Sequence, residues 1–283
     1  MPQQALNVVF AIDDLYLPGV VATARSVRRG AGERTPIRFH VIDAGLSPAG
    51  RGAVEERLGP LGEVTVHQVP DRLVMPQHKW FTSATLGRLH LGSVIPEDVA
   101  RVLYLDADTL VLEDPSRLYH TDPGPGGLAA VVNEVGPTRS LVLSEDGTAE
   151  QREHGAAPPG YFNAGVLLVD MNVWRAEDMT GRGIRLFERY GRTLRDLDQA
   201  VLNILFSGRW RSLPMKWNKM IEHRRLGKFG NGRLDYLTRR EGIVHYVGQV
   251  KPWHEGFPQN PLRALYAEFA APAPGVPQSA TGR

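Results

Sequence analysis

Short apolar segments alternate with helical patterns along most of this chain, and this alternation restricts the fold more than any other feature of the sequence. Short apolar runs rich in β-branched residues are typical of strands buried on both faces. Between these runs apolar residues recur at helical spacing, as Val20, Ala24 and Val27 do. The predicted strands cover 7–12, 37–42, 64–69, 102–105, 128–132, 162–169 and 243–247, and the predicted helices cover 19–28, 47–58, 82–91, 182–190 and 197–206.

Strands that alternate with helices favour an α/β fold with a mostly parallel, Rossmann-like central sheet flanked by helices. The chain of 283 residues is long enough for one large domain of this kind, and we predict a single domain over residues 1–270. Residues 271–283 are rich in Ala, Pro and Gly, which predicts a disordered tail. Residues 134–159 are polar and predict a loop, either an active-site lid or an insertion without a catalytic role.

Composition argues against several classes of protein. The formal net charge is only +2, and its basic residues are spread along the chain, which argues against a nucleic-acid partner. Cysteine is absent, so the sequence has no disulfide framework and no thiolate metal site. The N-terminus lacks the apolar segment of a signal peptide, and no apolar run approaches the ~20 residues of a membrane span. We predict a cytoplasmic protein without a transmembrane segment, and its oligomeric state is left open.

Two carboxylates, Asp106 and Asp108, directly follow the apolar strand predicted at 102–105. Ligands of open α/β sheets bind beyond the carboxyl ends of the strands. Hard divalent cations prefer oxygen ligands and often bind through one or two carboxylates together with substrate phosphates. The pair therefore suits Mg²⁺ or Mn²⁺ bound to a diphosphate. For an isolated Asp-x-Asp, a turn in which aspartate caps its own backbone is the commoner explanation, and the apolar strand before this pair favours the metal site without deciding between the two.

A second group of polar residues follows the strand predicted at 243–247. His245 leaves this strand, Gly248 allows a close backbone approach, and Lys251 follows six residues after the histidine. A neutral imidazole is a good ligand for Mn²⁺, and a lysine ammonium is a suitable point charge for a phosphate oxygen. The alternative is a buried histidine bonded to the backbone and a lysine on the surface.

Taken together and in this order, these segments resemble glycosyltransferase family 8, a retaining family with the GT-A fold. The resemblance is nearest to the bacterial lipopolysaccharide α-galactosyltransferases and more distant to the glycogenins. It runs from about residue 7 to residue 253. The matching segments are Phe10-Ala11-Ile12-Asp13-Asp14, Leu103-Tyr104-Leu105-Asp106-Ala107-Asp108, Tyr161-Phe162-Asn163-Ala164-Gly165-Val166, Asp198-Gln199, Trp217-Asn218 and His245-x-x-Gly248-x-x-Lys251-Pro252-Trp253.

The resemblance implies roles for individual residues. Asp106, Asp108 and His245 would bind a divalent ion, Mn²⁺ or Mg²⁺. Asp198 would bind sugar hydroxyls, and Gln199 would lie near the anomeric carbon on the face opposite the leaving group. The implied catalytic set is Gln199, Asp198 and Lys251, and the implied donor-binding set is Ala11, Asp13, Tyr16, Arg88, Asp106, Ala107, Asn163, Ala164, Gly248 and Lys251.

The implied activity is metal-dependent, retaining transfer of a hexose-type sugar from a UDP-sugar to a saccharide or small-molecule acceptor. Leu15 and Asn133 depart from the galactosyltransferase pattern, so the identities of the sugar and the acceptor stay open. A sugar nucleotidyltransferase is one alternative, but it needs a Gly-rich basic loop after the first strand, where Asp13 and Asp14 stand instead. A non-catalytic nucleotide-sugar-binding protein and a glycogenin-like protein that glycosylates itself are the others.

Overall fold

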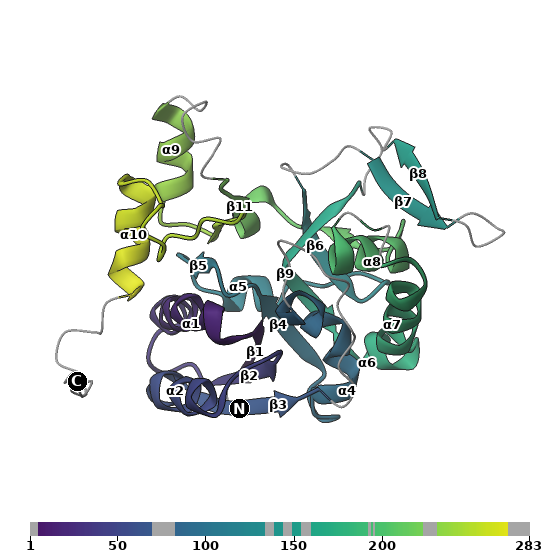
Figure 1. Cartoon of the computed structure of the whole chain (residues 1–283), viewed down its shortest axis with the longest axis horizontal. Coiled ribbons are helices and arrows are strands. Elements are labelled where there is room, and N and C mark those ends of the chain that lie inside the picture. The colour runs from purple at the N-terminus through teal and green to yellow at the C-terminus, as the bar shows by residue number, and fades with distance from the viewer. Residues whose placement is uncertain are drawn as a thin grey trace.

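The computed structural model describes residues 5–69, 83–133, 139–143, 149–153, 160–191, 194, 196–222 and 231–270. Its centre is a sheet of seven strands in the order β10-β6-β9-β4-β1-β2-β3 (Figure 1). The strands of this sheet are β1 (Leu6–Ile12), β2 (Ile37–Asp43), β3 (Glu63–Gln68), β4 (Arg101–Leu105), β6 (Leu128–Val132), β9 (Phe162–Asp170) and β10 (Arg211–Ser212).

The mostly parallel sheet predicted from the sequence is confirmed, with one antiparallel strand inside it. Strand β1 pairs in parallel with both β2 and β4, and β2 pairs in parallel with β3. Strand β9 runs antiparallel to its neighbours β4 and β6. Because β9 is antiparallel, its first residues lie at the same edge of the sheet as the last residues of β4.

Two hydrophobic cores lie on opposite faces of the sheet, and successive residues of one strand enter different cores. In β1, Val9 and Ala11 belong to one core, whereas Val8 and Phe10 belong to the other. A strand buried on both faces needs apolar residues at every position, which is why this segment is a continuous apolar run. The same packing holds for β4, where Leu103 and Leu105 face the side opposite Val102 and Tyr104.

Helices cover both faces of the sheet. Helices α1 (Leu17–Ala31) and α2 (Pro48–Leu58) lie on one side, and α7 (Met179–Tyr190) and α8 (Leu197–Leu205) lie on the other (Figure 1). Ser47 caps α2 as predicted, because its hydroxyl accepts a hydrogen bond from the Gly50 amide at 3.0 Å. The remaining helices are α5 (Ser116–Tyr119), α6 (Met171–Ala176), α9 (Asn231–Thr238) and α10 (Pro261–Ala270), with 3₁₀ turns η1 (Asp14–Tyr16), η2 (Gly59–Leu61) and η4 (Met215–Asn218).

The single helix predicted over 82–91 is wrong. The structure has three short elements here, namely α3 (Ser83–Leu86), the 3₁₀ turn η3 (Gly87–His90) and α4 (Leu91–Val94). The tighter 3₁₀ turn lies directly against β1, and it buries the side chain of Arg88, which a regular surface helix would not do.

A second, three-stranded sheet has the order β11-β12-β5, and of its strands only β12 falls within a predicted strand, that at 243–247. Its strands are β5 (Thr109–Val111), β11 (Lys219–Met220) and β12 (Ile243–His245). In this sheet His245 pairs with Thr109, and the Tyr246 amide donates to the Asp108 carbonyl at 2.9 Å. The small sheet therefore brings the end of β12 to the two aspartates that follow β4.

The predicted loop over 134–159 contains secondary structure. Strands β7 (Arg139–Leu143) and β8 (Ala149–Glu153) form an antiparallel pair that projects beside α8 (Figure 1). The remainder of this segment and the predicted tail at 271–283 lie outside the described residues.

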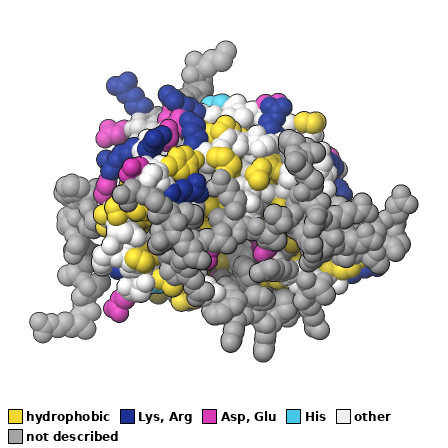
Figure 2. Space-filling view, turned by 90° about the horizontal axis from the view of Figure 1, so that it is seen from above, with side chains coloured by type: hydrophobic (Ala, Val, Ile, Leu, Met, Phe, Trp, Pro, Cys, Tyr) yellow, Lys and Arg dark blue, Asp and Glu magenta, His cyan; other side chains and the backbone are white. Residues whose placement is uncertain are grey.

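Within the described ranges, no helix combines the length and the apolar character that crossing a membrane requires. Lys and Arg side chains gather on one side of the face shown in Figure 2, with Asp and Glu side chains between them. On the α1 and α10 surface, for example, Glu268 forms ion pairs with both Arg29 and Arg240.

Candidate metal centre and donor site

The two aspartates that follow β4 face the interior of the site. A turn closes directly after β4, because the Thr109 amide and hydroxyl both donate to the Asp106 carbonyl, at 3.2 and 2.9 Å. Asp106 Oδ1 accepts hydrogen bonds from Arg88 Nη2 at 2.8 Å and from the Tyr104 hydroxyl at 3.2 Å. The hydrogen bonds of the Asp106 and Asp108 carboxylates go to other side chains. A turn in which each aspartate only caps its own backbone therefore does not explain the two residues.

His245 meets both carboxylates, as the sequence predicted. Its Nε2 atom lies 3.2 Å from Asp108 Oδ1 and 3.7 Å from Asp106 Oδ2. One ligand atom from each residue falls within 4.8 Å of the others. Neighbouring ligands of an octahedral ion with bonds of about 2.1 Å are about 3 Å apart, so these separations suit a divalent ion.

A buried oxygen supports this assignment. Asp108 Oδ1 has no hydrogen-bond partner, and Asp108 is only 6% exposed. An unpartnered buried acceptor is costly, and a bound cation removes that cost. The three side chains thus fit a hard or borderline metal ion with oxygen and imidazole ligands.

Gly165 in β9 lets these ligands approach one another. Its carbonyl accepts the Asp106 amide at 2.8 Å, which holds the two chains side by side. A Cβ atom on Gly165 would lie only 2.2 Å from His245 Cε1 and 2.8 Å from Asp106 Oδ2. No other residue fits this position without displacing a predicted metal ligand.

Lys251 is buried beside the cluster. Its ammonium donates to Asp108 Oδ2 at 2.5 Å and to the Tyr246 carbonyl at 3.0 Å. Burial alone would raise the pKa of Asp108, but Lys251 and the ring of His245 outweigh burial and hold this pKa well below its ordinary value. Asp108 is therefore anionic at neutral pH.

Arg88 connects the aspartate pair with α8. Its Nη2 atom bonds Asp106, its Nη1 atom donates to the Ala164 carbonyl, and its Nε atom lies 2.7 Å from Asp198 Oδ2. The guanidinium also stands 4.8 Å from the centre of the Tyr104 ring. Arg88 is 7% exposed, so its position is fixed by these contacts.

Asp198 has the opposite electrostatic character to Asp108. Burial raises the pKa of the Asp198 carboxyl to about 7, because Arg88 offsets only part of the burial and Asp106 adds negative charge nearby. Although Asp198 Oδ2 lies close to Arg88, it lacks a partner with hydrogen-bond geometry. Asp198 is only 2% exposed.

Gln199 contacts the start of β9. Its Oε1 atom accepts hydrogen bonds from Asn163 Nδ2 at 3.1 Å and from the Ala164 amide at 3.0 Å. Arg88 contacts the same stretch of β9 through the Ala164 carbonyl. The residues predicted to line the sugar pocket thus lie next to Gln199.

The residues predicted to hold the base lie at the end of β1. Asp13 accepts hydrogen bonds from the Leu15 and Tyr16 amides at 3.0 and 3.3 Å and so caps η1. The Tyr16 ring packs edge-on against Trp253 at 5.9 Å and lies 5.8 Å from the Lys251 ammonium. These contacts connect the predicted base site with the predicted diphosphate site.

Three further predicted residues belong to the same surroundings. Ala11 is buried at the end of β1, where a Cβ atom built on Gly87 would lie 2.6 Å from the Ala11 methyl group. Ala107 lies between the two aspartates. Gly248 has φ +95°, a left-handed conformation that favours glycine in the turn between His245 and Lys251.

Asn218 and Tyr104 contact the site residues without having been assigned roles from the sequence. Asn218 Oδ1 lies 3.0 Å from His245 Nδ1, and Asn218 is 0% exposed. The Trp217-Asn218 segment was noted as a matching motif, but a role for Asn218 emerges only from its neighbours in space. Tyr104 was hidden within an apolar strand, where its hydroxyl gives no periodic signal.

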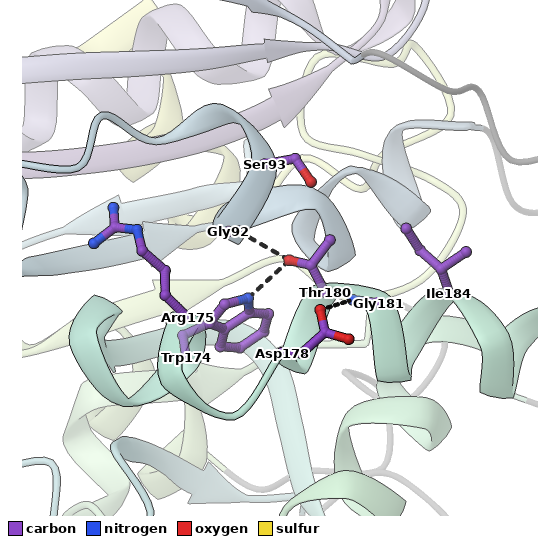
Figure 3. Close-up of a pocket in the computed structure, with 8 residues that line it drawn as sticks. All are labelled: Gly92, Ser93, Trp174, Arg175, Asp178, Thr180, Gly181 and Ile184. Carbon is purple, nitrogen blue, oxygen red and sulfur yellow. Dashed lines mark hydrogen bonds between the residues drawn. The ribbon is translucent and has the colours of Figure 1, made fainter.

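A cavity of about 300 Å³ lies away from this cluster, between α4, α6 and α7 (Figure 3). Figure 3 shows the Thr180 hydroxyl pointing toward Trp174 and Gly92, from which it accepts hydrogen bonds at 3.0 Å each. Asp178 caps the start of α7 by accepting the Gly181 amide. These groups hold helices together, and none of the predicted site residues lines the cavity.

Comparison with known proteins agrees with this geometry. The model of glycosyl transferase family 8 matches residues 7–256. General stress protein A of Bacillus subtilis (strain 168) is 26% identical over 278 residues, covering 94% of this chain and 93% of that protein. The lipopolysaccharide 1,2-glucosyltransferase of Escherichia coli (strain K12) is 26% identical over 261 residues, covering 89% of this chain and 74% of that protein.

A solved structure of the galactosyltransferase LgtC, in complex with donor and acceptor sugar analogues, superposes with a TM-score of 0.71. It is 29% identical in sequence, and the match covers 94% of this chain and 95% of LgtC. The α/β architecture is accordingly the GT-A fold, as predicted from the sequence. The chain belongs to glycosyl transferase family 8 and is a sugar-transferring enzyme.

Proposed function

We propose that this enzyme transfers a hexose-type sugar, with retention of anomeric configuration, from a UDP-sugar to a saccharide or small-molecule acceptor, and that it requires Mn²⁺ or Mg²⁺. The observation that carries the proposal is the cluster of Asp106, Asp108 and His245 around an unpartnered buried oxygen. The lipopolysaccharide glucosyltransferase and galactosyltransferase relatives support a hexose as the transferred group.

Cleavage of the anomeric C–O bond leaves negative charge on the departing diphosphate. A divalent ion bound by the cluster supplies a Lewis acid for those oxygens. Lys251 adds a second positive charge, which is already buried and held in place by the Tyr246 carbonyl. Charges that are preorganised for the leaving group stabilise the transition state more than the ground state, and so they increase the rate.

Retention requires either attack from the leaving-group face or two successive inversions. Two inversions need a nucleophile beneath the sugar, and the amide of Gln199 is a poor one. Asp198 is 2% exposed and occupied by Arg88, which does not suit a group that must reach the anomeric carbon. We therefore favour front-face attack, in which the acceptor oxygen bonds to the anomeric carbon while its proton passes to the departing phosphate oxygen.

The other site residues then bind the donor. Asp13 and Tyr16 hold the uracil base, Asn163 and Ala164 line the sugar pocket, and Gly248 provides the turn that brings its backbone to the diphosphate. Two contacts support these assignments: the Tyr16 ring lies 5.8 Å from the Lys251 ammonium, and the Ala164 amide bonds Gln199.

A panel of nucleotide sugars tests the proposal. The protein is incubated with each UDP-sugar and Mn²⁺, and released UDP is measured with and without a chelator. We expect one UDP-hexose to be hydrolysed slowly, only with the ion present, and faster when its acceptor is added. Equal rates in the chelator, or equal use of ADP- and GDP-sugars, would contradict the proposed donor and metal dependence.

A further inference from the structure

Asn218 stands behind the metal cluster, completely buried at the end of η4. We propose that Asn218 is a positioning residue that fixes which ring nitrogen of His245 is free to bind the ion, and that it links this ligand to Gln199. The inference rests on the proposed metal site. It follows from the donor-to-acceptor direction along one continuous series of hydrogen bonds, from Gln199 through Asn163 and Asn218 to His245.

Two backbone amides, which can only donate, fix the direction of the hydrogen bonds at one end of this series. The Gly165 amide donates to Asn163 Oδ1 at 2.9 Å, and the Ala164 amide donates to Gln199 Oε1 at 3.0 Å. These bonds identify the oxygen end of both side-chain amides. Asn163 Nδ2 accordingly donates to Gln199 Oε1 at 3.1 Å.

The same reasoning assigns the donor and the acceptor of the Asn218 side chain, and from them the proton on His245. Because Asn163 Oδ1 accepts, the Asn218 group 2.8 Å from it is the Nδ2 donor. Asn218 Oδ1 therefore faces His245 Nδ1 at 3.0 Å, and a carbonyl oxygen can only accept. It follows that Nδ1 carries a proton, which leaves Nε2 of the neutral ring as the acceptor facing Asp106 and Asp108.

This arrangement suits a metal ligand. In the neutral ring, a bare Nε2 atom beside two carboxylate oxygens brings lone pairs together, and a positive charge on Nε2, either a proton or a bound metal ion, makes the contact favourable. A ligating histidine commonly donates its other N–H to a fixed acceptor, which orients the ring and raises its basicity. Asn218 supplies that acceptor, and its own NH₂ group is anchored through Asn163.

This series of hydrogen bonds also couples the two parts of the site. Gln199 Oε1 receives both of its donors from β9, and one of them, Asn163, is held in turn by Asn218. Without Asn218, Asn163 loses a donor and the orientation of Gln199 is no longer tied to His245. A residue far from the anomeric carbon would thereby affect the group beneath it.

The tautomer is measurable in the wild-type protein without any metal. In ¹⁵N-histidine-labelled protein at about pH 9, where imidazoles are ordinarily neutral, we expect the His245 signal to show a protonated Nδ1. The signal is assigned by its absence from His245→Gln. A bare Nδ1 atom would overturn the inference, and this result does not depend on whether the ion binds.

Substitutions test the effect on the ligand. Asn218→Ala should weaken Mn²⁺ binding, measured by calorimetry, by about 10- to 100-fold, the usual effect of removing such a partner. Asn218→Asp keeps an acceptor for Nδ1–H but cannot donate to Asn163, so it should bind Mn²⁺ near the wild-type affinity and show altered turnover. If Asn218→Ala does not fold, Asn218→Asp carries the test, and a bare Nδ1 in this variant overturns the inference.

Asn203 is a matched control. It is also a buried asparagine, and it bonds the Phe162 amide, the Phe162 carbonyl and the Gln199 carbonyl at 2.8, 2.9 and 2.8 Å. Asn203→Ala should lose stability but keep Mn²⁺ affinity. Equal loss of Mn²⁺ affinity in both alanine variants would show that Asn218 acts only through packing. Failure of the wild-type protein to bind Mn²⁺ would refute the proposed metal site instead.

Discussion

Two buried carboxylates, Asp108 and Asp198, lie in different parts of the site, and their surroundings shift their pKa values in opposite directions. Burial acts to raise the pKa of each. Lys251 reverses this effect at Asp108, whereas Arg88 is shared with Asp106 and leaves the pKa of Asp198 at about 7. Asp108, on the side proposed to meet the diphosphate, is thus kept anionic, whereas the pKa of Asp198, on the side proposed to lie beneath the sugar, is near neutral pH.

The comparison supports the proposal that the site binds a cation. Arg88 and Lys251 pair with three carboxylates, those of Asp106, Asp108 and Asp198, and Asp198 is the one whose pKa burial raises. Opposed environments of this kind commonly assign different roles to chemically identical groups. Here they are consistent with the proposed ion binding by Asp108 and with a different, untested role for Asp198.

Removal of Arg88 should have the largest effect on stability. Arg88→Met leaves the buried Asp198 and the half-buried Asp106 without their shared cation, and breaking a buried pair such as that with Asp198 costs about 3–5 kcal/mol. Urea unfolding measures the loss. Arg51→Met is the control, because Arg51 is more exposed and Asp43 keeps Gln68 and two backbone donors. A loss in Arg88→Met no greater than in Arg51→Met would contradict the shared-cation account.

The stability lost on replacing Lys251 should be partly restored by a bound metal ion. Lys251→Met leaves Asp108 without its ammonium partner, and a bound ion replaces that charge. We expect Mn²⁺ at about 100 times its dissociation constant to add about 2.7 kcal/mol of stability to this variant. Turnover should still fall on the order of 10²-fold, because a charge that stabilises the leaving group is lost.

Thermal unfolding of Lys251→Met and Arg88→Met, each with and without Mn²⁺, distinguishes the role of Lys251 from that of Arg88. Mn²⁺ should stabilise both variants, because both keep Asp106, Asp108 and His245. In Arg88→Met, however, the part of the loss that comes from Asp198 should remain with Mn²⁺ bound, since Asp198 lies outside the ligand cluster. Full recovery of Arg88→Met to the stability of the Mn²⁺-bound wild type would remove the distinction between the two sides of the site.

A smaller effect is expected for the pH dependence of stability. The pKa of Asp198 is about 7 in the folded protein and about 3.9 when unfolded, so the folded state retains a proton that the unfolded chain releases. This contribution to stability is fully present below about pH 4 and is lost as the pH rises through about 7. Asp198→Asn should abolish that component.

The measurement is the difference between wild type and Asp198→Asn in urea unfolding at several pH values. Relative to Asp198→Asn, wild type should lose stability as the pH rises from about 4 to about 7. Asp122→Asn, at an exposed ion pair with Arg211, serves as the control and should follow wild type. A constant difference across this range would show that Asp198 is ionised throughout.

Much of the large sheet was predictable because its strands are buried on both faces. The runs at 7–12 and 102–105 gave nearly the observed bounds of β1 and β4. In the small sheet, β12 was predicted within the strand at 243–247, but β5 and β11 were missed, since strands of two or three residues have no periodic signal. The helix predicted at 82–91 is interrupted by the 3₁₀ turn η3, which carries the buried Arg88, and helical spacing of apolar residues does not distinguish the two kinds of helix.

The candidate site was predicted from the order of its motifs, and the structure brings the predicted ligands together. Asn218 received no role, because its importance depends on the polarity of hydrogen bonds to residues 27 and 55 positions away. Such a relation exists only in three dimensions. The single-domain organisation of 1–270, the cytoplasmic location and the individual donor contacts stay predictions.

Direct titration of Mn²⁺ into the protein tests the central claim, that Asp106, Asp108 and His245 bind one divalent ion together. Calorimetry of the wild type should give one site, which is lost in Asp108→Asn while circular dichroism shows an intact fold. Asp114→Asn, a change at an exposed aspartate next to the same chain segment, should bind normally. Undiminished Mn²⁺ binding by a folded Asp108→Asn protein would contradict the account.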